Sequence, residues 1–185
     1  GEQGKYPFQI TGAGVRAAQE LLVYFAENGV EIASAQEDGL YRNTWNEDPE
    51  QLAKAAEVFK LYKDLFDKGI VNPSAKNWTW EDTDNNLVTG IVSSFVSGNW
   101  LRNSVSGNEE TMSDLSVHAI PHPEGGESYT YMECKPIFLF KDAKNKEGAI
   151  NLMKAIAGKE WQEKVWSFGS PRSDVQADSM WGEGF

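Results

Sequence analysis

The stretch that most constrains the fold is IVSSFVSGNWLRN, residues 91–103. Its first six residues are apolar or small with little polar alternation, a pattern typical of a strand buried on both faces. Beyond Gly98, three side chains suited to binding follow within four positions: Asn99, Trp100 and Arg102. Because ligand sites of α/β folds lie at the carboxyl ends of strands, the stretch predicts a buried strand that leads into a binding site.

Helical patterns surround this expected strand. Residues 15–27 place a set of apolar side chains on one helical face: Val15, Ala18, Leu22 and Phe25. A second helix is expected to start at Pro49, with Asp48 as its cap and Gln51 completing a capping box, and to stop at Gly69.

Shorter elements complete the pattern. We expect a helix over residues 81–88, a late helix starting near Asn145, and a further helical segment over residues 159–168 after a break at Gly158. Short strands are expected at residues 30–34, near residues 113–120 and at residues 135–140. Helices that alternate with short strands predict an α/β fold.

Composition excludes several classes of partner. The chain has 185 residues and a net charge of −11, so it should repel nucleic acid and anionic membrane surfaces. Its single cysteine, Cys134, allows neither an intramolecular disulfide nor a multi-cysteine metal site. No apolar run approaches the ~20 residues that span a bilayer.

One short glycine motif suggests nucleotide chemistry. GAGVRA, residues 12–17, fits the dinucleotide fingerprint G-x-G-x-x-A ahead of a helix. Against it, the preceding segment contains Pro7 and Gln9, and no acidic residue clearly ends the next strand. Two other interpretations stay open: a tight loop before a helix, and a loop whose backbone N–H groups meet a ligand's oxygens.

Other catalytic and metal-binding signals are weak. His118 and His122 are four residues apart, but Pro121 and Pro123 exclude a helix that would bring them together on one face. The sequence holds no G-x-S-x-G or S-x-x-K motif. We therefore expect neither a metal, nor a cofactor, nor an enzyme.

The aromatic clusters carry more weight. Seven tryptophans are many for a chain of this length, and indole is seldom fully buried. A flat indole covers the apolar face of a sugar ring, while neighbouring polar side chains bind its hydroxyls. Trp100 has such neighbours in Asn99 and Arg102, whereas Trp78 and Trp80 are equally well explained as hydrophobic anchors of their loop.

The central region resembles a known family. Residues 59–69 read FKLYKDLFDKG, a helix that ends at a glycine, and residues 90–100 read GIVSSFVSGNW. In this order they are similar to extracellular solute-binding proteins, family 1 type, of carbohydrate ABC importers. Ser93 and Ser94 stand where the family usually has Ala-Met. Further similar pieces follow in the family's order: AIPHPEGG (119–126), FKDAKNKEGA (140–149) and GSPRSDV (169–175).

The resemblance implies a partial fold of the periplasmic-binding-protein type II kind. Residues 1–116 are expected to belong to the C-terminal lobe, residues 117–168 to cross toward the other lobe, and residues 169–185 to form a hinge or tail. Family members are about twice as long, so the chain looks like a fragment. The full-length protein is then expected to be extracellular or periplasmic and tethered as a lipoprotein.

The resemblance also implies a function and a site. The protein would capture a sugar or oligosaccharide in a cleft between lobes and deliver it to an ABC permease, with the remaining lobe as a further partner. Trp100 would stack on a sugar ring, and Asn99, Arg102 and Gln9 would bind hydroxyls; Trp80, Glu133 and Arg172 are further candidates. The alternatives are a nucleotide-dependent enzyme that uses GAGVRA and a non-catalytic interaction module.

Overall fold

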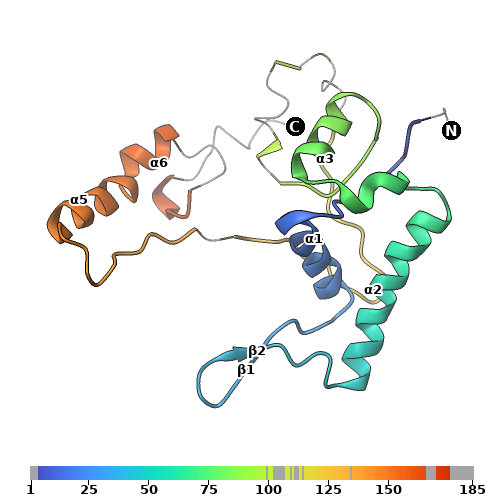
Figure 1. Cartoon of the computed structure of the whole chain (residues 1–185), viewed down its shortest axis with the longest axis horizontal. Helices are drawn as coiled ribbons and strands as arrows, with labels where there is room; N and C mark the ends of the chain where they lie inside the picture. The colour runs from blue at the N-terminus through green and yellow to red at the C-terminus, as the bar shows by residue number, and fades with distance from the viewer. Residues whose placement is uncertain are drawn as a thin grey trace. The chain divides into compact units, whose positions relative to one another are not determined.

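The chain forms two compact units. The computed structural model describes residues 4–98, 100–101, 107–108, 110, 113, 115–133, 135–165 and 170–175 (Figure 1). Unit 1 consists of Gly1–Asp114 and His118–Tyr131, and unit 2 of Leu115–Val117 and Met132–Phe185. The expected regions had different boundaries, and their correspondence to lobes of the family stays a prediction.

Unit 1 is built on two long helices, α1 (Gly14–Glu27) and α2 (Pro49–Asp67). Phe25 of α1 packs with Ala55 and Val58 of α2 and with Val30, and Trp45 meets the Phe25 ring edge-to-face with centroids 5.4 Å apart. The burial of these apolar side chains against one another holds α1 and α2 together.

The buried face of α1 is not the one predicted. Val15 is 70% exposed, whereas Arg16, Glu20 and Glu27 are buried. Polar partners explain part of the difference, because the Glu20 carboxylate accepts a hydrogen bond from the Thr11 backbone N–H on the inner side. Of the predicted inner residues, Phe25 is buried.

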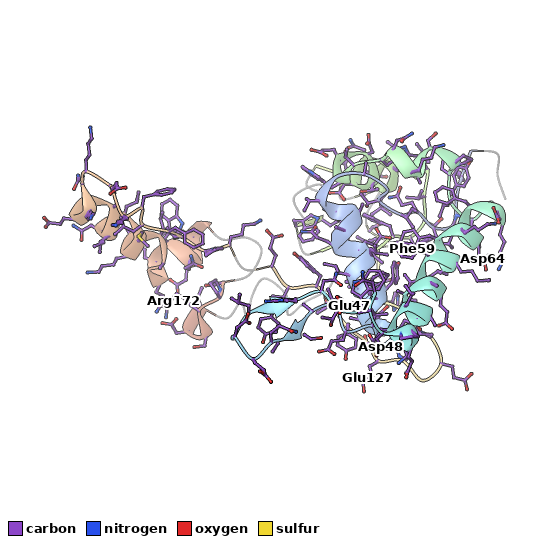
Figure 2. The ribbon with its side chains drawn as sticks, turned by 60° about the horizontal axis from the view of Figure 1, so that its bottom comes forward. Glu47, Asp48, Phe59, Asp64, Glu127 and Arg172 are labelled. Carbon is purple, nitrogen blue, oxygen red and sulfur yellow. The ribbon has the colours of Figure 1, made fainter. Side chains whose placement is uncertain are left out.

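α2 begins at the residue that the sequence predicts. Asp48 Oδ1 accepts hydrogen bonds from the backbone N–H groups of Glu50 (2.8 Å) and Gln51 (3.4 Å), and Pro49 occupies the first turn. Figure 2 shows Asp48 at this end of α2 and Asp64 toward the other. The helix stops before Gly69, whose φ of 63° lies in the region that glycine adopts without steric cost.

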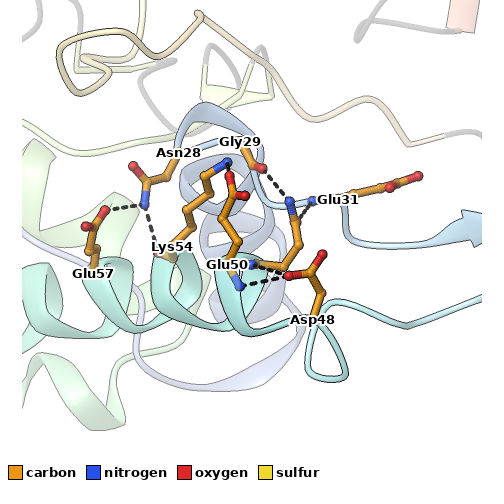
Figure 3. A network of polar contacts seen from close by, with 8 residues as sticks. Asn28, Gly29, Glu31, Asp48, Glu50, Lys54 and Glu57 are labelled. Atoms are coloured by element: carbon orange, nitrogen blue, oxygen red, sulfur yellow. Dashed lines mark hydrogen bonds and ion pairs between the residues drawn. The ribbon is translucent and has the colours of Figure 1, made fainter.

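The predicted capping box at Gln51 is wrong. Its Oε1 accepts from the Glu31 N–H at 2.6 Å, and its Nε2 donates to the Gly29 carbonyl at 3.3 Å. Beside it, Asn28 Nδ2 donates to the Lys54 carbonyl at 2.8 Å (Figure 3). The chain after α1 presents the Gly29 carbonyl and the Glu31 N–H beside α2, and Gln51 pairs with these groups instead of with its own helix end.

An extended segment near the N-terminus, residues 6–9, pairs in parallel with residues 92–95. The bridges join Tyr6 to Val92 and Gln9 to Phe95, with Tyr6 N–H donating to Ile91 O at 2.8 Å. The pairing forms isolated bridges, and Ser93 and Ser94 are exposed. Residues 91–96 are therefore extended but not a strand buried on both faces, because the two serines turn toward water.

A second small core lies under this segment. Ile10, Val71 and Ala75 are buried together, with Trp78 packed against them. Ala75 belongs to the 3-10 helix η1 (Pro73–Asn77), which leads into α3 (Trp80–Val88). At the start of α3 the Thr79 N–H donates to Asp82 Oδ2 at 2.8 Å, as in a capping box.

The only sheet among the described residues is a hairpin. It joins β1 (Ser34–Ala35) to β2 (Tyr41–Arg42), with Ser34 opposite Arg42 and Ala35 opposite Tyr41. Of the strand expected at residues 30–34, only Ser34 belongs to an observed strand, β1. Gly39 in the connecting turn has a φ of 78°.

Unit 2 is helical in its described part. It contains α5 (Lys146–Ile156), α6 (Lys159–Val165) and the 3-10 helix η2 (Ser173–Val175). Asn145 caps α5 by accepting from the Gly148 N–H at 2.9 Å, as its position predicts. The strand expected at residues 135–140 is not formed, and no strand among the described residues pairs with this stretch. Within the described parts of both units, no helix is long and apolar enough to cross a membrane.

Candidate ligand site

Unit 1 contains a cavity of about 280 Å³. Three segments line it: residues 16–23 of α1, the end of the extended segment with Trp100, and residues from the 118–131 part of the unit. The lining residues are Arg16, Gln19, Glu20, Val23, Val96, Ser97, Gly98, Trp100, Ile120, Thr130 and Tyr131. The cavity therefore sits at the end of the bridged segment, where the sequence predicts a site.

Trp100 lies against the backbone of Gly98. A Cβ atom at position 98 would come within 2.2 Å of the indole ring carbons, so this close approach requires glycine. The Arg16 guanidinium carbon lies 4.4 Å from the indole centroid, within cation–π range. The indole Nε1 is buried and has no hydrogen-bond partner among the described residues.

Glu20 brings a carboxylate into the cavity lining. Its residue is 2% exposed, and Oε2 accepts from the Thr11 N–H at 3.1 Å. Oε1 has no partner within the described part of the chain. Burial raises the pKa of Glu20 to about 7, against the opposing effects of the Thr11 hydrogen bond and the Arg16 charge.

Arg16 links α1 to the segment that carries Trp100. It is buried, and its guanidinium makes a long hydrogen bond of 3.5 Å to Ser97 Oγ. Burial lowers the pKa of Arg16, and the nearby carboxylates of Asp84, Glu20 and Glu81 oppose that shift. The cavity thus holds one cationic and one acidic side chain, four residues apart on the same helix.

Of the four residues predicted to form the main ligand contacts, the structure describes Trp100 and Gln9. Trp100 lines the cavity, while Asn99 and Arg102 lie outside the described residues. Gln9 is fully buried; its Nε2 donates to the Thr83 carbonyl at 2.7 Å and its Oε1 accepts from Asn86 Nδ2 at 3.3 Å. Gln9 therefore ties the N-terminal segment to α3, and its fully buried side chain is not part of the cavity lining.

The three further candidates are not among the residues that line the cavity. Trp80 is 45% exposed at the start of α3. Glu133 and Arg172 belong to unit 2, where Glu133 pairs with Lys135. Arg172 makes two hydrogen bonds of 2.8 Å to the Asp174 carboxylate and a third, of 3.0 Å, to the Ala157 carbonyl. Their part in ligand binding stays a prediction.

Sequence reasoning missed Arg16 and Glu20. The apolar pattern of α1 placed Val15 on the inner face, which sends Arg16 outward. A signal was present: two opposite charges four residues apart, directly after a glycine loop and at the start of a helix. On sequence alone, that spacing equally describes a surface ion pair.

The GAGVRA loop is closed by protein contacts. The Gly12 N–H donates to the Ala75 carbonyl and the Ala13 N–H to the Trp78 carbonyl, both at 3.0 Å. A Cβ at position 12 would lie 2.4 Å from Ala75 O, so the glycine serves close backbone packing. With both of these N–H groups engaged within the protein, the first two residues of the motif offer no backbone donor to a dinucleotide phosphate. In the described part of the chain no three metal-ligating side chains gather.

Comparison with known proteins identifies the family. The sequence profile of the bacterial extracellular solute-binding proteins matches residues 1–163. The chain belongs to this family. Its expected kinship to solute-binding proteins is thereby confirmed, and the family implies the periplasmic-binding-protein type II fold. The described residues are mostly helical with one two-stranded sheet, so the α/β layout expected from the sequence is seen only in part.

Curated proteins resemble part of the chain at low identity. Proteins of Brucella abortus and Brucella suis, named as binding proteins with no ligand in the name, are 29% identical over 110 residues. That stretch is 60% of this chain but 26% of each relative, so the match spans about a quarter of their length. No solved structure matches the chain.

Proposed function

We propose that the protein captures a sugar or oligosaccharide as the solute-binding component of an ABC importer. The observation that carries the proposal is Trp100, an indole in the lining of a cavity within a chain of the solute-binding family. Aromatic rings and a few placed polar groups in a concavity are the usual means of binding a neutral organic solute.

The cavity fits this use in its details. One face of the Trp100 ring carries the Arg16 guanidinium, so a sugar ring contacts the indole on the part left open to the cavity. Asn99 and Arg102, which flank Trp100 in the sequence, are proposed to bind hydroxyls there. We leave Gln9 out of the proposed contacts because its amide bonds to Thr83 and Asn86.

The wider setting is also proposed. The protein would work outside the cytoplasmic membrane, in the periplasm or tethered as a lipoprotein, and pass its ligand to a membrane permease. A complete cleft would need a second lobe of the same protein, since both lobes together bury most of a ligand's surface. The family of binding proteins, in which no catalytic role is indicated, supports a non-enzymatic function.

A ligand screen tests the proposal. Thermal-shift and calorimetric titrations would compare neutral mono- to tetrasaccharides with NAD, the ligand of the alternative nucleotide function. We expect saturable sugar binding that Trp100→Ala abolishes, and no response to NAD because the Gly12 and Ala13 N–H groups are occupied. Stabilisation by NAD without any response to sugars would overturn the proposal, and binding of neither would favour an interaction module.

A further inference from the structure

Two residues of the cavity lining each carry a buried polar atom that lacks a partner among the described residues. Among the described residues, neither Glu20 Oε1 nor Trp100 Nε1 makes a hydrogen bond. Leaving a buried polar group unpaired costs about 1–3 kcal/mol, and native proteins rarely accept it. Two such atoms on side chains that line one cavity indicate a partner that enters the cavity.

The chemistry of the two atoms restricts that partner. The indole N–H is only a donor, while a carboxylate oxygen is an acceptor. A hydroxyl both donates and accepts, so hydroxyls of one ligand can satisfy both atoms. An anionic ligand would bring its charge against Glu20, and a cationic ligand would bring its charge against Arg16. The lining therefore favours a neutral ligand rich in hydroxyls.

We infer that Glu20 and the indole N–H of Trp100 are specificity-determining groups that select a neutral ligand through its hydroxyls. The inference rests on the proposed function, because it assumes that the cavity is the solute site. Glu20 accepts a ligand hydroxyl on Oε1 while Thr11 holds Oε2 in place. Arg16 is a positioning residue, since its guanidinium lies over the indole and its charge balances that of Glu20.

The test compares variants and ligand charge in the 185-residue chain. Saturation-transfer NMR titrations at pH 8, where Glu20 is mostly ionised, would use three kinds of trisaccharide: neutral (maltotriose, cellotriose, xylotriose), cationic (a glucosamine trimer) and anionic (a galacturonic acid trimer). The variants are Trp100→Phe, which removes only the N–H and part of the ring, and Glu20→Gln, which removes the charge and keeps an acceptor for Thr11. Glu47→Gln, an exposed carboxylate outside the cavity lining, is the matched control.

We expect the wild type and Glu47→Gln to bind a neutral trimer at least about tenfold more tightly than either charged trimer. Trp100→Phe should weaken the neutral trimer about fivefold, the effect of one neutral hydrogen bond. Glu20→Gln should weaken it about threefold, because a charge-assisted bond becomes a neutral one, and should narrow the gap to the anionic trimer. A purely structural role of Glu20 would not move that selectivity.

The outcomes separate this inference from the proposed function. Saturable neutral binding that both variants leave unchanged in affinity and selectivity would overturn the inference and leave the function standing. No saturable binding of any trisaccharide would overturn the proposed function itself. Circular dichroism checks folding; if Glu20→Gln fails to fold, the charge selectivity of the wild type and the Trp100→Phe affinity decide the inference.

Discussion

At the scale of single residues, Glu20 gives the structure a pH dependence of definite sign. Its pKa is about 7 in the folded protein against 4.5 ordinarily, because burial disfavours the charged form. Between these values the unfolded chain loses this proton while the folded chain keeps it. The contribution of Glu20 to the free energy of unfolding therefore falls as the pH rises from 4.5 to 7, by about 3 kcal/mol in total.

Glu20→Gln removes this dependence. Urea unfolding of the variant and the wild type between pH 4 and pH 8.5 should show the variant gaining stability relative to the wild type from pH 4.5 to pH 7, with a constant difference above. The amide retains an acceptor for the Thr11 N–H. Parallel stability curves for the two proteins would contradict the burial of an ionisable group at this position.

Gly12 provides a second test at the residue scale. A Cβ at this position would lie 2.4 Å from both Ala75 O and the Lys76 Cα, which are backbone atoms that cannot move aside easily. Gly12→Ala should therefore lower the free energy of unfolding by about 1–3 kcal/mol in urea titrations. An unchanged stability would mean that the loop does not pack on η1 and would return the dinucleotide interpretation to consideration.

At the scale of elements, α2 depends on its cap. Asp48→Ala removes the acceptor for the Glu50 and Gln51 N–H groups and should destabilise unit 1 by about 1 kcal/mol. Glu47→Ala, one residue earlier and exposed, is the control and should change stability by less than about 0.5 kcal/mol. Equal effects of the two substitutions in thermal unfolding would argue against the cap.

Local signals explain which elements could be predicted. Asp48 with Pro49, Asn145 and Gly69 each act within a few residues of the chain, and each marks a helix end where the sequence placed it. Gln51 was misjudged because its partners, the Glu31 N–H and the Gly29 carbonyl, lie about twenty residues away. The inner face of α1 and the pairing of residues 91–96 likewise depend on contacts that no local pattern contains.

The residues of the candidate site could likewise be predicted only where the signal is local in the sequence. Trp100 was found because a glycine turn and a strand-like stretch precede it, and both are local features. Arg16 and Glu20 were missed because their burial comes from Thr11, Ser97 and the indole, which reach them only in the folded unit. The resemblance suggests Gln9 as a ligand contact, and its burial could not be predicted because its partners on α3 are more than seventy residues away.

At the scale of the whole molecule, the two units differ in how much they bury. Unit 1 has two apolar clusters, whereas Gln162 is the only buried side chain in the described part of unit 2. Hydrogen exchange should therefore find slow amides in the middle of α2, near Ala55 and Val58, and fast amides in α5. Equal protection of α2 and α5 in the 185-residue chain would contradict the difference in burial between the two units.

The central claim is that the cavity beside Trp100 receives the ligand. Its most direct test follows the indole N–H resonances of all seven tryptophans by NMR while a neutral trisaccharide is added, with Trp100→Phe supplying the assignment. We expect the Trp100 indole N–H to shift most, because a ligand hydroxyl becomes its hydrogen-bond partner. A saturable shift of other indoles, such as those of Trp78 or Trp161, with Trp100 unmoved would contradict it.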